Sequence, residues 1–192
     1  PPLLRQWTEF LRRLVAVIGS TAAGKSALAL SLAQRFGGEI VNADSRQIYR
    51  GMDIGTAKPS PETRALLPHH LYDIAEPYDS YSLALYRRDA QAALENIWAR
   101  GEFAWLVGGT GQYVWALLEA WQVPDVPPQP HLRAELEVVA EREGVEALHA
   151  RLRVVDAEAA DRIDARNVRR VIRALEVQQV TGRPISSWQT KG

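Results

Sequence analysis

The chain carries the octapeptide Gly19-Ser20-Thr21-Ala22-Ala23-Gly24-Lys25-Ser26, which has the spacing of a phosphate-binding loop: Gly, four free positions, then Gly-Lys-Ser. An apolar, β-branched run over 14–18 predicts a buried strand before it, and apolar residues at helical spacing over 26–36 predict a helix after it. Such a loop wraps backbone N–H groups around an anion, and the helix N-terminus adds partial positive charge. Lys25 supplies a full charge and the Ser26 hydroxyl can bind Mg²⁺. We expect these residues to bind a diphosphate or triphosphate; the alternative is a glycine-containing turn with an exposed lysine.

The composition is that of an ordinary soluble protein: 192 residues, 46% hydrophobic, 24% charged, with a net charge of zero. This length predicts one core and a small appendage. The absence of cysteine excludes disulfides, zinc–thiolate sites and thiol nucleophiles. A nucleic-acid partner would have to be contacted by a local basic patch. Because no apolar run has membrane-spanning length and no signal peptide is evident, we expect a cytoplasmic protein without membrane contact.

A polar tetrapeptide follows the second predicted strand. Gly37-Gly38 ends the helix, 39–43 predicts the strand, and Asp44-Ser45-Arg46-Gln47 comes next. Ligands of an open α/β sheet bind beyond the carboxyl ends of its strands. We therefore expect Asp44 near the anion without being part of its cradle. The alternative is an aspartate that caps the following turn.

Further elements follow from periodicity and from glycine and proline. A loop over 51–60 carries Lys58, which is either a second phosphate-side cation or a solvated lysine. The remaining elements before the next glycine pair are a strand over 70–74, a helix over 81–100 and a strand over 103–107.

The strand over 103–107 ends in Gly108-Gly109-Thr110. Two glycines allow close approach of the backbone to a ligand, and Thr110 would present a hydroxyl there. The alternative is a plain tight turn.

The character of the sequence changes after a predicted helix over 112–120, where Pro124, Pro127, Pro128 and Pro130 mark a linker. The charged, strand-poor stretch 131–163 predicts a small helical insertion in an α/β fold. We expect a core over 1–121, an insertion domain over 122–166 and a return to the core over 167–192. Residues 1–13 predict an amphipathic helix that docks on the core or lies on a membrane surface.

A basic helix is predicted after Asn167, which can cap it. Its apolar stripe is Val168, Ile172 and Leu175, and its opposite face gathers Arg169, Arg170 and Arg173. This face could follow the phosphates of a polynucleotide or could simply be solvated.

Five stretches together resemble the tRNA dimethylallyltransferase family: Gly-Ser-Thr-Ala-Ala-Gly-Lys-Ser at 19–26, Asn-Ala-Asp-Ser-Arg-Gln-Ile-Tyr-Arg at 42–50, Asp-Ile-Gly-Thr-Ala-Lys-Pro at 53–59, Leu-Val-Gly-Gly-Thr at 106–110 and Arg-Arg-Val-Ile-Arg-Ala-Leu-Glu-Val at 169–177. That family transfers an isopentenyl group to N6 of an adenosine beside the anticodon. The resemblance implies a P-loop NTPase-like parallel sheet flanked by helices, with a small helical insertion domain. The family continues well past the last residue here, so we expect a C-terminally truncated chain.

The resemblance also implies roles for the candidate residues. Residues 19–26 would bind the diphosphate of dimethylallyl diphosphate, with Mg²⁺ at Ser26, and Thr21 and Lys25 would stabilise the leaving group. Asp44 would orient the N6 amine and take its proton. The tRNA contacts implied are Asp44, Ser45, Arg46, Gln47, Thr110, Arg169, Arg170 and Arg173, with a bidentate contact from Gln47 to an adenine edge. We expect a monomer.

Three alternatives stay open. The first is a relative that prenylates free adenosine nucleotides, and the second is a small-molecule kinase in which the loop holds ATP and Asp44 activates a hydroxyl. The third, which is not an enzyme, is a nucleotide-gated RNA-binding module.

Overall fold

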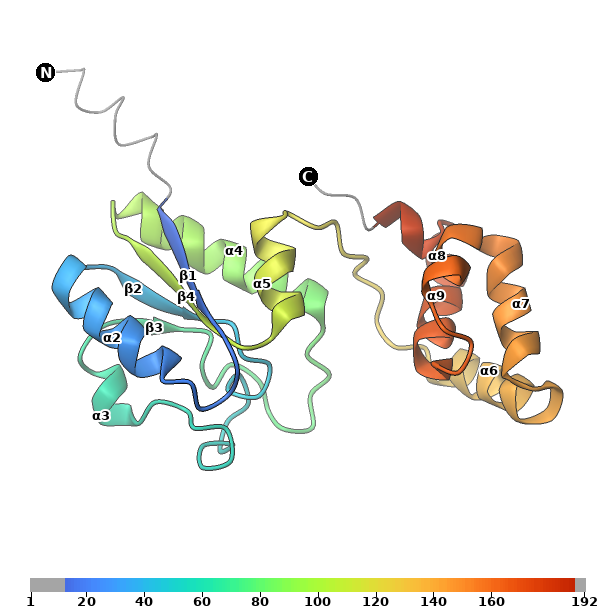
Figure 1. The fold of residues 1–192 in the computed structure, drawn as a ribbon, viewed down its shortest axis with the longest axis horizontal. Helices are drawn as coiled ribbons and strands as arrows, with labels where there is room; N and C mark the ends of the chain where they lie inside the picture. Colours follow the sequence, from blue (N-terminus) through green and yellow to red (C-terminus); the bar gives the residue numbers. More distant parts are fainter. Residues whose placement is uncertain (1–12, 189–192) are drawn as a thin grey trace, which may run out of the picture. The chain divides into compact units, whose positions relative to one another are not determined.

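The computed structural model describes residues 13–188. The amphipathic helix predicted over 1–13 therefore lies almost wholly outside the described residues. The chain divides into two compact units, Pro1–Leu118 and Glu119–Gly192, and each is described by itself (Figure 1).

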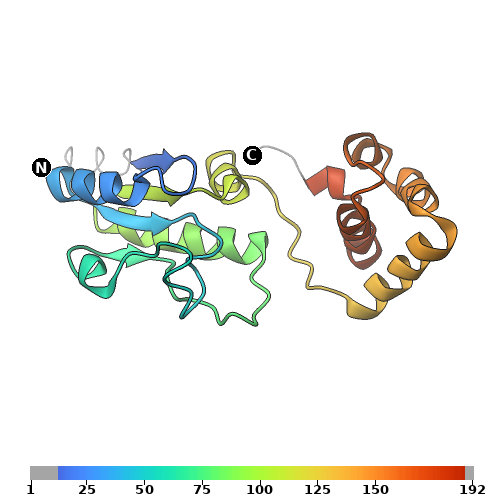
Figure 2. The same cartoon turned by 60° about the horizontal axis from the view of Figure 1, so that its bottom comes forward.

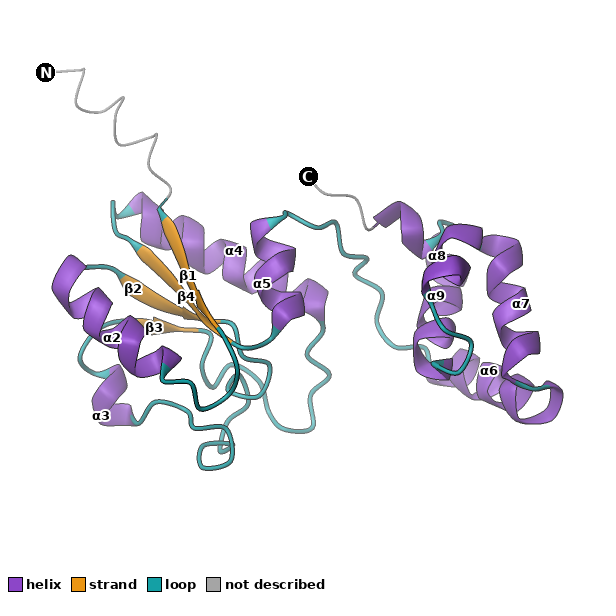
Figure 3. Cartoon of the chain, in the orientation of Figure 1, coloured by secondary structure: helices purple, strands orange, loops and turns teal. Residues whose placement is uncertain are grey.

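The first unit contains a four-stranded parallel sheet with the order β1-β4-β2-β3. Its strands are β1 (Leu14–Ile18), β2 (Glu39–Asn42), β3 (His69–His70) and β4 (Ala104–Gly108), drawn in orange in Figure 3. Its helices are α2 (Lys25–Phe36), α3 (Pro61–Arg64), α4 (Leu83–Ala99) and α5 (Gly111–Leu118). The predicted fold class, a P-loop NTPase-like parallel sheet flanked by helices, is confirmed.

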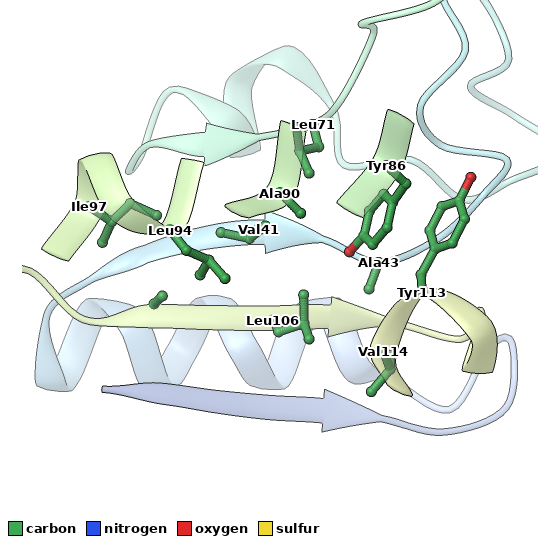
Figure 4. Packing of buried hydrophobic residues seen from close by; sticks show 11 residues of the cluster. Val41, Ala43, Leu71, Tyr86, Ala90, Leu94, Ile97, Leu106, Tyr113 and Val114 are labelled. Carbon is green, nitrogen blue, oxygen red and sulfur yellow. The ribbon is translucent and has the colours of Figure 1, made fainter. Parts of the chain in front are cut away.

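The sheet lies between two layers of helix because successive side chains of a strand point to opposite faces. Leu106 and Val41 join α4 and α5 in one hydrophobic cluster, whereas Val107 and Ile40 join α2 in another. In Figure 4, the α4 side chains lie over Val41 and Leu106, and Figure 2 shows the same layers from a second direction. Strands β2 and β4 are buried on both faces, as central strands of a parallel sheet are.

The edges of the sheet differ from its centre. At one edge, β3 has two residues, although a strand over 70–74 was predicted. Leu71 and Asp73 have φ angles of 65° and 55°, and this left-handed backbone ends the strand. At the other edge is β1, where Val15 and Ile18 are exposed.

The second unit is helical and consists of α6 (Pro130–Glu143), α7 (Val145–Val155), α8 (Ala157–Arg162), α9 (Val168–Thr181) and a short 3₁₀ turn, η1 (Ile185–Trp188). As predicted, the Asn167 side chain caps α9 by accepting the Arg170 N–H at 3.3 Å. Ile172 and Leu175 of α9 pack in one hydrophobic cluster with Leu136 of α6 and Leu152 of α7. This grouping differs from the expected boundaries, which returned 167–192 to the core. An apolar stripe shows that a helix has a buried face but not which elements cover it.

Among the residues that the structure describes, no helix is long and apolar enough to cross a membrane.

Candidate phosphate loop and acceptor segment

The phosphate loop, residues 19–26, connects the carboxyl end of β1 to the start of α2. Gly24 has a φ of 78°, a left-handed conformation that favours glycine and that turns the chain into the helix. Residues 19–24 are exposed, and Lys25 Nζ donates to Ser20 O at 2.6 Å. The eight residues predicted to bind a diphosphate thus form an exposed loop, residues 19–24, followed by the half-buried Lys25 and Ser26 at the N-terminus of α2, where anions are favoured.

The two glycines at the end of β4, Gly108 and Gly109, each lie close to a different part of the chain. A Cβ on Gly108 would overlap the backbone carbonyl of Ala43, so this glycine is required by the adjacent strand β2. A Cβ on Gly109 would lie 3.2 Å from Gly19 O and 3.9 Å from Lys25 Nζ. A close approach to a ligand was expected for this pair. In the structure, Gly108 instead lies against the backbone of Ala43, and Gly109 lies against the phosphate loop.

The segment over 44–49, here called the acceptor segment, begins at the end of β2. Asn42 Oδ1 accepts the Asp44 N–H at 2.9 Å, and Asn42 Nδ2 donates to Asp44 O and to Leu71 O. Thr110 Oγ1 accepts the Ser45 N–H at 2.9 Å. The structure thus brings Thr110 against the acceptor segment, where its hydroxyl bonds to the protein. Asn42 was missed in the sequence, where its position as the last polar residue of a buried strand was the available signal.

The capping interpretation of Asp44 is confirmed for one of its two oxygens. Oδ1 accepts the Arg46 N–H at 2.9 Å, which is the turn-capping role. Within residues 13–188, Oδ2 makes no hydrogen bond or ion pair, and the side chain is partly exposed. One oxygen of the carboxylate is therefore held by the turn, and the other has no partner among the described residues.

Two stacked tyrosines support the acceptor segment from the α4 and α5 side. The rings of Tyr86 and Tyr113 are 3.7 Å apart between centroids and 9° from parallel, and they lie side by side in Figure 4. Tyr86 Oη donates to Asn42 O at 3.0 Å. Burial, with smaller contributions from Tyr49 and Asp44, raises the pKa of Tyr113 to about 12. Tyr113 is thus neutral at physiological pH and is no general base.

Gln47 and Lys58 are not placed as expected. Gln47 is buried, and its Nε2 donates to Thr56 O at 2.8 Å and to Ala57 O at 3.4 Å, so its amide donor is already used inside the protein. Lys58 was expected to be a phosphate-side cation or a solvated lysine, and both expectations were wrong. Its side chain is 1% exposed and pairs with Asp53 and Asp73.

The three arginines of α9 also differ from one another. Arg169 and Arg170 are exposed. Arg173 Nη1 donates to Glu176 Oε2 at 2.6 Å and to Val126 O at 3.0 Å. Burial alone would raise the pKa of Glu176, but hydrogen bonds from Arg133, Arg173 and the Gln129 N–H lower it to about 2. Arg173 therefore has a structural role that the sequence pattern did not reveal.

An apolar cavity of about 270 Å³ adjoins the phosphate loop on the α2 side of the sheet. Its lining residues are Ser26, Ala27, Leu30, Ile40, Ala57, Pro59, Thr63, His69, Tyr72 and Val107. Aliphatic groups make up most of the lining, with polar atoms from Ser26, Thr63, His69 and Tyr72, so the cavity suits an alkyl group more than a charged one.

The donor set suits a metal held mainly by its substrate. Within the described residues, no group of three or more His, Cys, Asp or Glu side chains could hold a metal ion. Ser26 offers one hard hydroxyl oxygen at the start of α2. Mg²⁺ is commonly bound by few protein ligands together with phosphate oxygens and water, so Ser26 fits such an ion bound with a diphosphate.

Comparison with known proteins identifies the family. The IPP transferase family model matches residues 47–192, and the isopentenyl transferase model matches residues 12–67. The chain is 60% identical over 181 residues to the tRNA dimethylallyltransferase of Chloroflexus aggregans, covering 94% of this chain and 61% of that relative. It is 59% identical over 170 residues to the tRNA dimethylallyltransferase of Thermomicrobium roseum, covering 88% of this chain and 52% of the relative.

Two solved structures agree. The full-length tRNA isopentenylpyrophosphate transferase of Bacillus halodurans is 44% identical with a TM-score of 0.57, and the match covers 91% of this chain and 57% of that one. A eukaryotic dimethylallyltransferase acting on tRNA is 28% identical with a TM-score of 0.72, and the match covers 93% and 46% of the two chains. The chain thus spans well under two thirds of the length of these proteins. Since one family model alone matches most of its residues, the chain belongs to the IPP transferase family.

Proposed function

We propose that this protein transfers the dimethylallyl group of dimethylallyl diphosphate to N6 of an adenosine beside the anticodon of tRNA, and releases diphosphate. One observation carries the proposal: the end of β4 joins a phosphate loop to a carboxylate-bearing segment. Gly109 abuts Gly19 and Lys25, and the next residue, Thr110, is bonded to Ser45 beside Asp44. A group transfer needs its anionic leaving group and its nucleophile at one such place.

On the donor side, the chemistry is stabilisation of a leaving group. As the bond between the allylic carbon and the diphosphate oxygen breaks, negative charge grows on diphosphate. The loop amides, the Lys25 ammonium and the Thr21 hydroxyl would stabilise that charge. Mg²⁺, when bound with the diphosphate at Ser26, would neutralise further charge. The largely apolar cavity beside Ser26 would offer the alkyl chain an apolar surface.

On the acceptor side, Asp44 is the base. The N6 amine forms the new bond to the allylic carbon and loses one proton, which Asp44 Oδ2 accepts and later passes to water. The hydrogen bond from the Arg46 N–H to Oδ1 holds the carboxylate during this step. Tyr113 stays protonated because its pKa is raised to about 12.

The tRNA contacts are proposed for the exposed basic residues. Arg169 and Arg170 present their side chains to solvent on α9 and suit phosphate contacts. Arg46, also exposed, lies in the acceptor segment itself. Arg173 would contribute less to tRNA binding, because its guanidinium already donates to Glu176 and to Val126 O.

The test is to incubate the full-length protein with dimethylallyl diphosphate, Mg²⁺ and unmodified tRNA, and to look for N6-prenyladenosine by mass spectrometry of the digested tRNA. We expect the product with tRNA and not with free AMP. Product with AMP alone would assign the protein to nucleotide prenylation. ATP-dependent phosphate transfer without prenylation would assign it to the kinases. RNA binding that is the same in the wild type and in Asp44→Asn, with no turnover by either, would favour a binding module.

A further inference from the structure

The Lys58 ammonium group is buried close to the acceptor segment, yet the steps above do not use it. Nζ donates to Tyr49 O at 2.6 Å and to Asp73 Oδ1 at 2.6 Å, and lies 2.8 Å from Asp53 Oδ1. An ammonium group has three N–H donors, and these three oxygens match them. Lys58 has therefore no donor left for a phosphate.

The three oxygens belong to three different segments of the chain. Tyr49 ends the acceptor segment, Asp53 lies in the loop over 52–57, and Asp73 lies in the turn after β3. Arg64 Nη1 donates to the other oxygen of Asp73 at 2.6 Å. The cluster thus contains two cations, Lys58 and Arg64, and two carboxylates, so its net charge is zero. A buried charge that loses one partner is costly, so these segments are held together.

Hydrogen bonds between uncharged groups also connect the same segments. Gln47 Nε2 donates to the loop at Thr56 O, and Ile48 O accepts the N–H groups of Ile74 and Ala75 from the turn. Within the described residues, Lys58 is the charged side chain that bonds to the acceptor segment, the loop and the turn together. The phosphate loop takes no part in this cluster, because the hydrogen bond of Lys25 is made to Ser20 O.

We propose that Lys58 is a positioning residue, which sets the acceptor segment so that the Asp44 carboxylate meets the incoming amine. The inference rests on the proposed function and adds to it a residue that touches neither substrate. Its physical basis is that a base misplaced by about 1 Å can cost about 100-fold in rate. Asp44 lies five residues before the backbone carbonyl that Lys58 binds, and within the described residues its own hydrogen bonds are to Asn42 and Arg46.

The first experiment compares Lys58→Met with Arg64→Met. Arg64→Met removes a cation from the same cluster but leaves all three bonds of Lys58. We expect Lys58→Met to lower kcat/KM for tRNA by about 10- to 100-fold and Arg64→Met to lower it by less than about threefold. Isothermal titration with inorganic diphosphate and Mg²⁺ should give Kd within about twofold of the wild type for both variants, since the phosphate loop lies outside the cluster. A parallel loss of diphosphate affinity in Lys58→Met would overturn the proposal.

A second experiment separates positioning from general loss of stability. In the Asp44→Asn background there is no base to position, so Lys58→Met should lower kcat by less than about threefold further. The same fold-loss in both backgrounds would show that Lys58 does not act through Asp44. If Lys58→Met does not fold, Lys58→Arg keeps the charge that Asp53 and Asp73 need, while its guanidinium cannot reproduce the three bonds. It is expected to lose about tenfold in kcat/KM and to show the same dependence on Asp44.

Amide hydrogen exchange measures directly, without an activity assay, how firmly the acceptor segment is held. Lys58→Met should speed exchange at Ile74, whose N–H donates to Ile48 O of the acceptor segment, and at Arg50 just after that segment, whose N–H donates to Ala75 O, and it should leave Leu28 of α2 unchanged. Unchanged exchange at Arg50 and Ile74 would overturn the positioning role. If instead the wild type makes no prenylated tRNA, the proposed function fails, and the exchange result still decides whether Lys58 holds this segment.

Discussion

The phosphate loop and the acceptor segment follow the carboxyl ends of two parallel strands, β1 and β2, but different interactions hold them in place. Residues 19–24 are exposed, and the shape of the loop follows from Gly24 and from its place before α2. In the acceptor segment, Gln47 and Ile48 are buried, and their partners lie in distant parts of the chain. The loop is thus a local backbone structure suited to any diphosphate, whereas the acceptor segment depends on side chains from several elements. Donor binding and acceptor alignment should therefore respond to different mutations.

The largest effect is expected for Asp44→Asn. Asparagine keeps an oxygen for the Arg46 N–H, so the turn persists while the base is lost. We expect kcat to fall by about 10²- to 10⁴-fold in the prenylation assay. Affinity for diphosphate, measured by titration, should stay unchanged. If diphosphate binding were lost as well, the separation of the two regions would not hold.

Lys25→Ala tests the donor side. It removes the full positive charge of the loop, so we expect turnover to fall by about 10²- to 10³-fold. Unlike Asp44→Asn, it should also weaken binding of diphosphate, while tRNA binding measured by filter retention survives. Arg35→Ala, at the far end of α2, is the control and should behave as the wild type. Normal diphosphate affinity in Lys25→Ala would contradict the assignment of this loop.

The comparison can be extended to the second unit, where Glu176 forms another buried cluster with Arg133 and Arg173. The pKa of Glu176 is lowered from its ordinary value of 4.5 to about 2, so its stabilising effect is present above pH 4.5 and is lost as the pH falls toward 2. A shift of that size corresponds to about 3 kcal/mol in the free energy of unfolding. Denaturant unfolding between these pH values should show the loss, and Glu176→Gln should reduce this pH dependence. An unchanged pH dependence in that variant would mean that other carboxylates cause it.

The smallest effect is expected for single arginines of α9. Arg170→Ala should weaken tRNA binding and reduce its salt dependence by about one unit of slope for each phosphate that the arginine neutralises in the wild type. Arg173→Ala should change tRNA binding less and lower the stability of the second unit more, because its partner Glu176 is buried. Both variants should keep the diphosphate affinity of the wild type. Loss of diphosphate affinity with intact tRNA binding in either would assign α9 to the donor instead.

Local patterns were sufficient to predict strands β1, β2 and β4, the helices α2 and α4 and the sequence motif of the phosphate loop, since each depends on nearby residues. The short β3 was not predictable from β-branching, because the left-handed backbone at Leu71 and Asp73 overrides it. The burial of Lys58 depends on Asp73, fifteen residues away, and the ion pair of the half-buried Arg173 depends on Glu176. Sequence spacing alone could not distinguish these cations from solvated ones, because the neutralising carboxylates are brought near only by the fold.

The position of β1 in the sheet has a consequence for solution behaviour. Within residues 13–188, β1 pairs with β4 and its other side has no strand beside it. That side presents a row of N–H and C=O groups next to the exposed Val15 and Ile18, and such a row can pair with a strand of another molecule. The 192-residue chain should therefore grow in apparent size with concentration in light scattering. A charged residue placed at Val15 should suppress that growth, because it interrupts the apolar surface along the open edge.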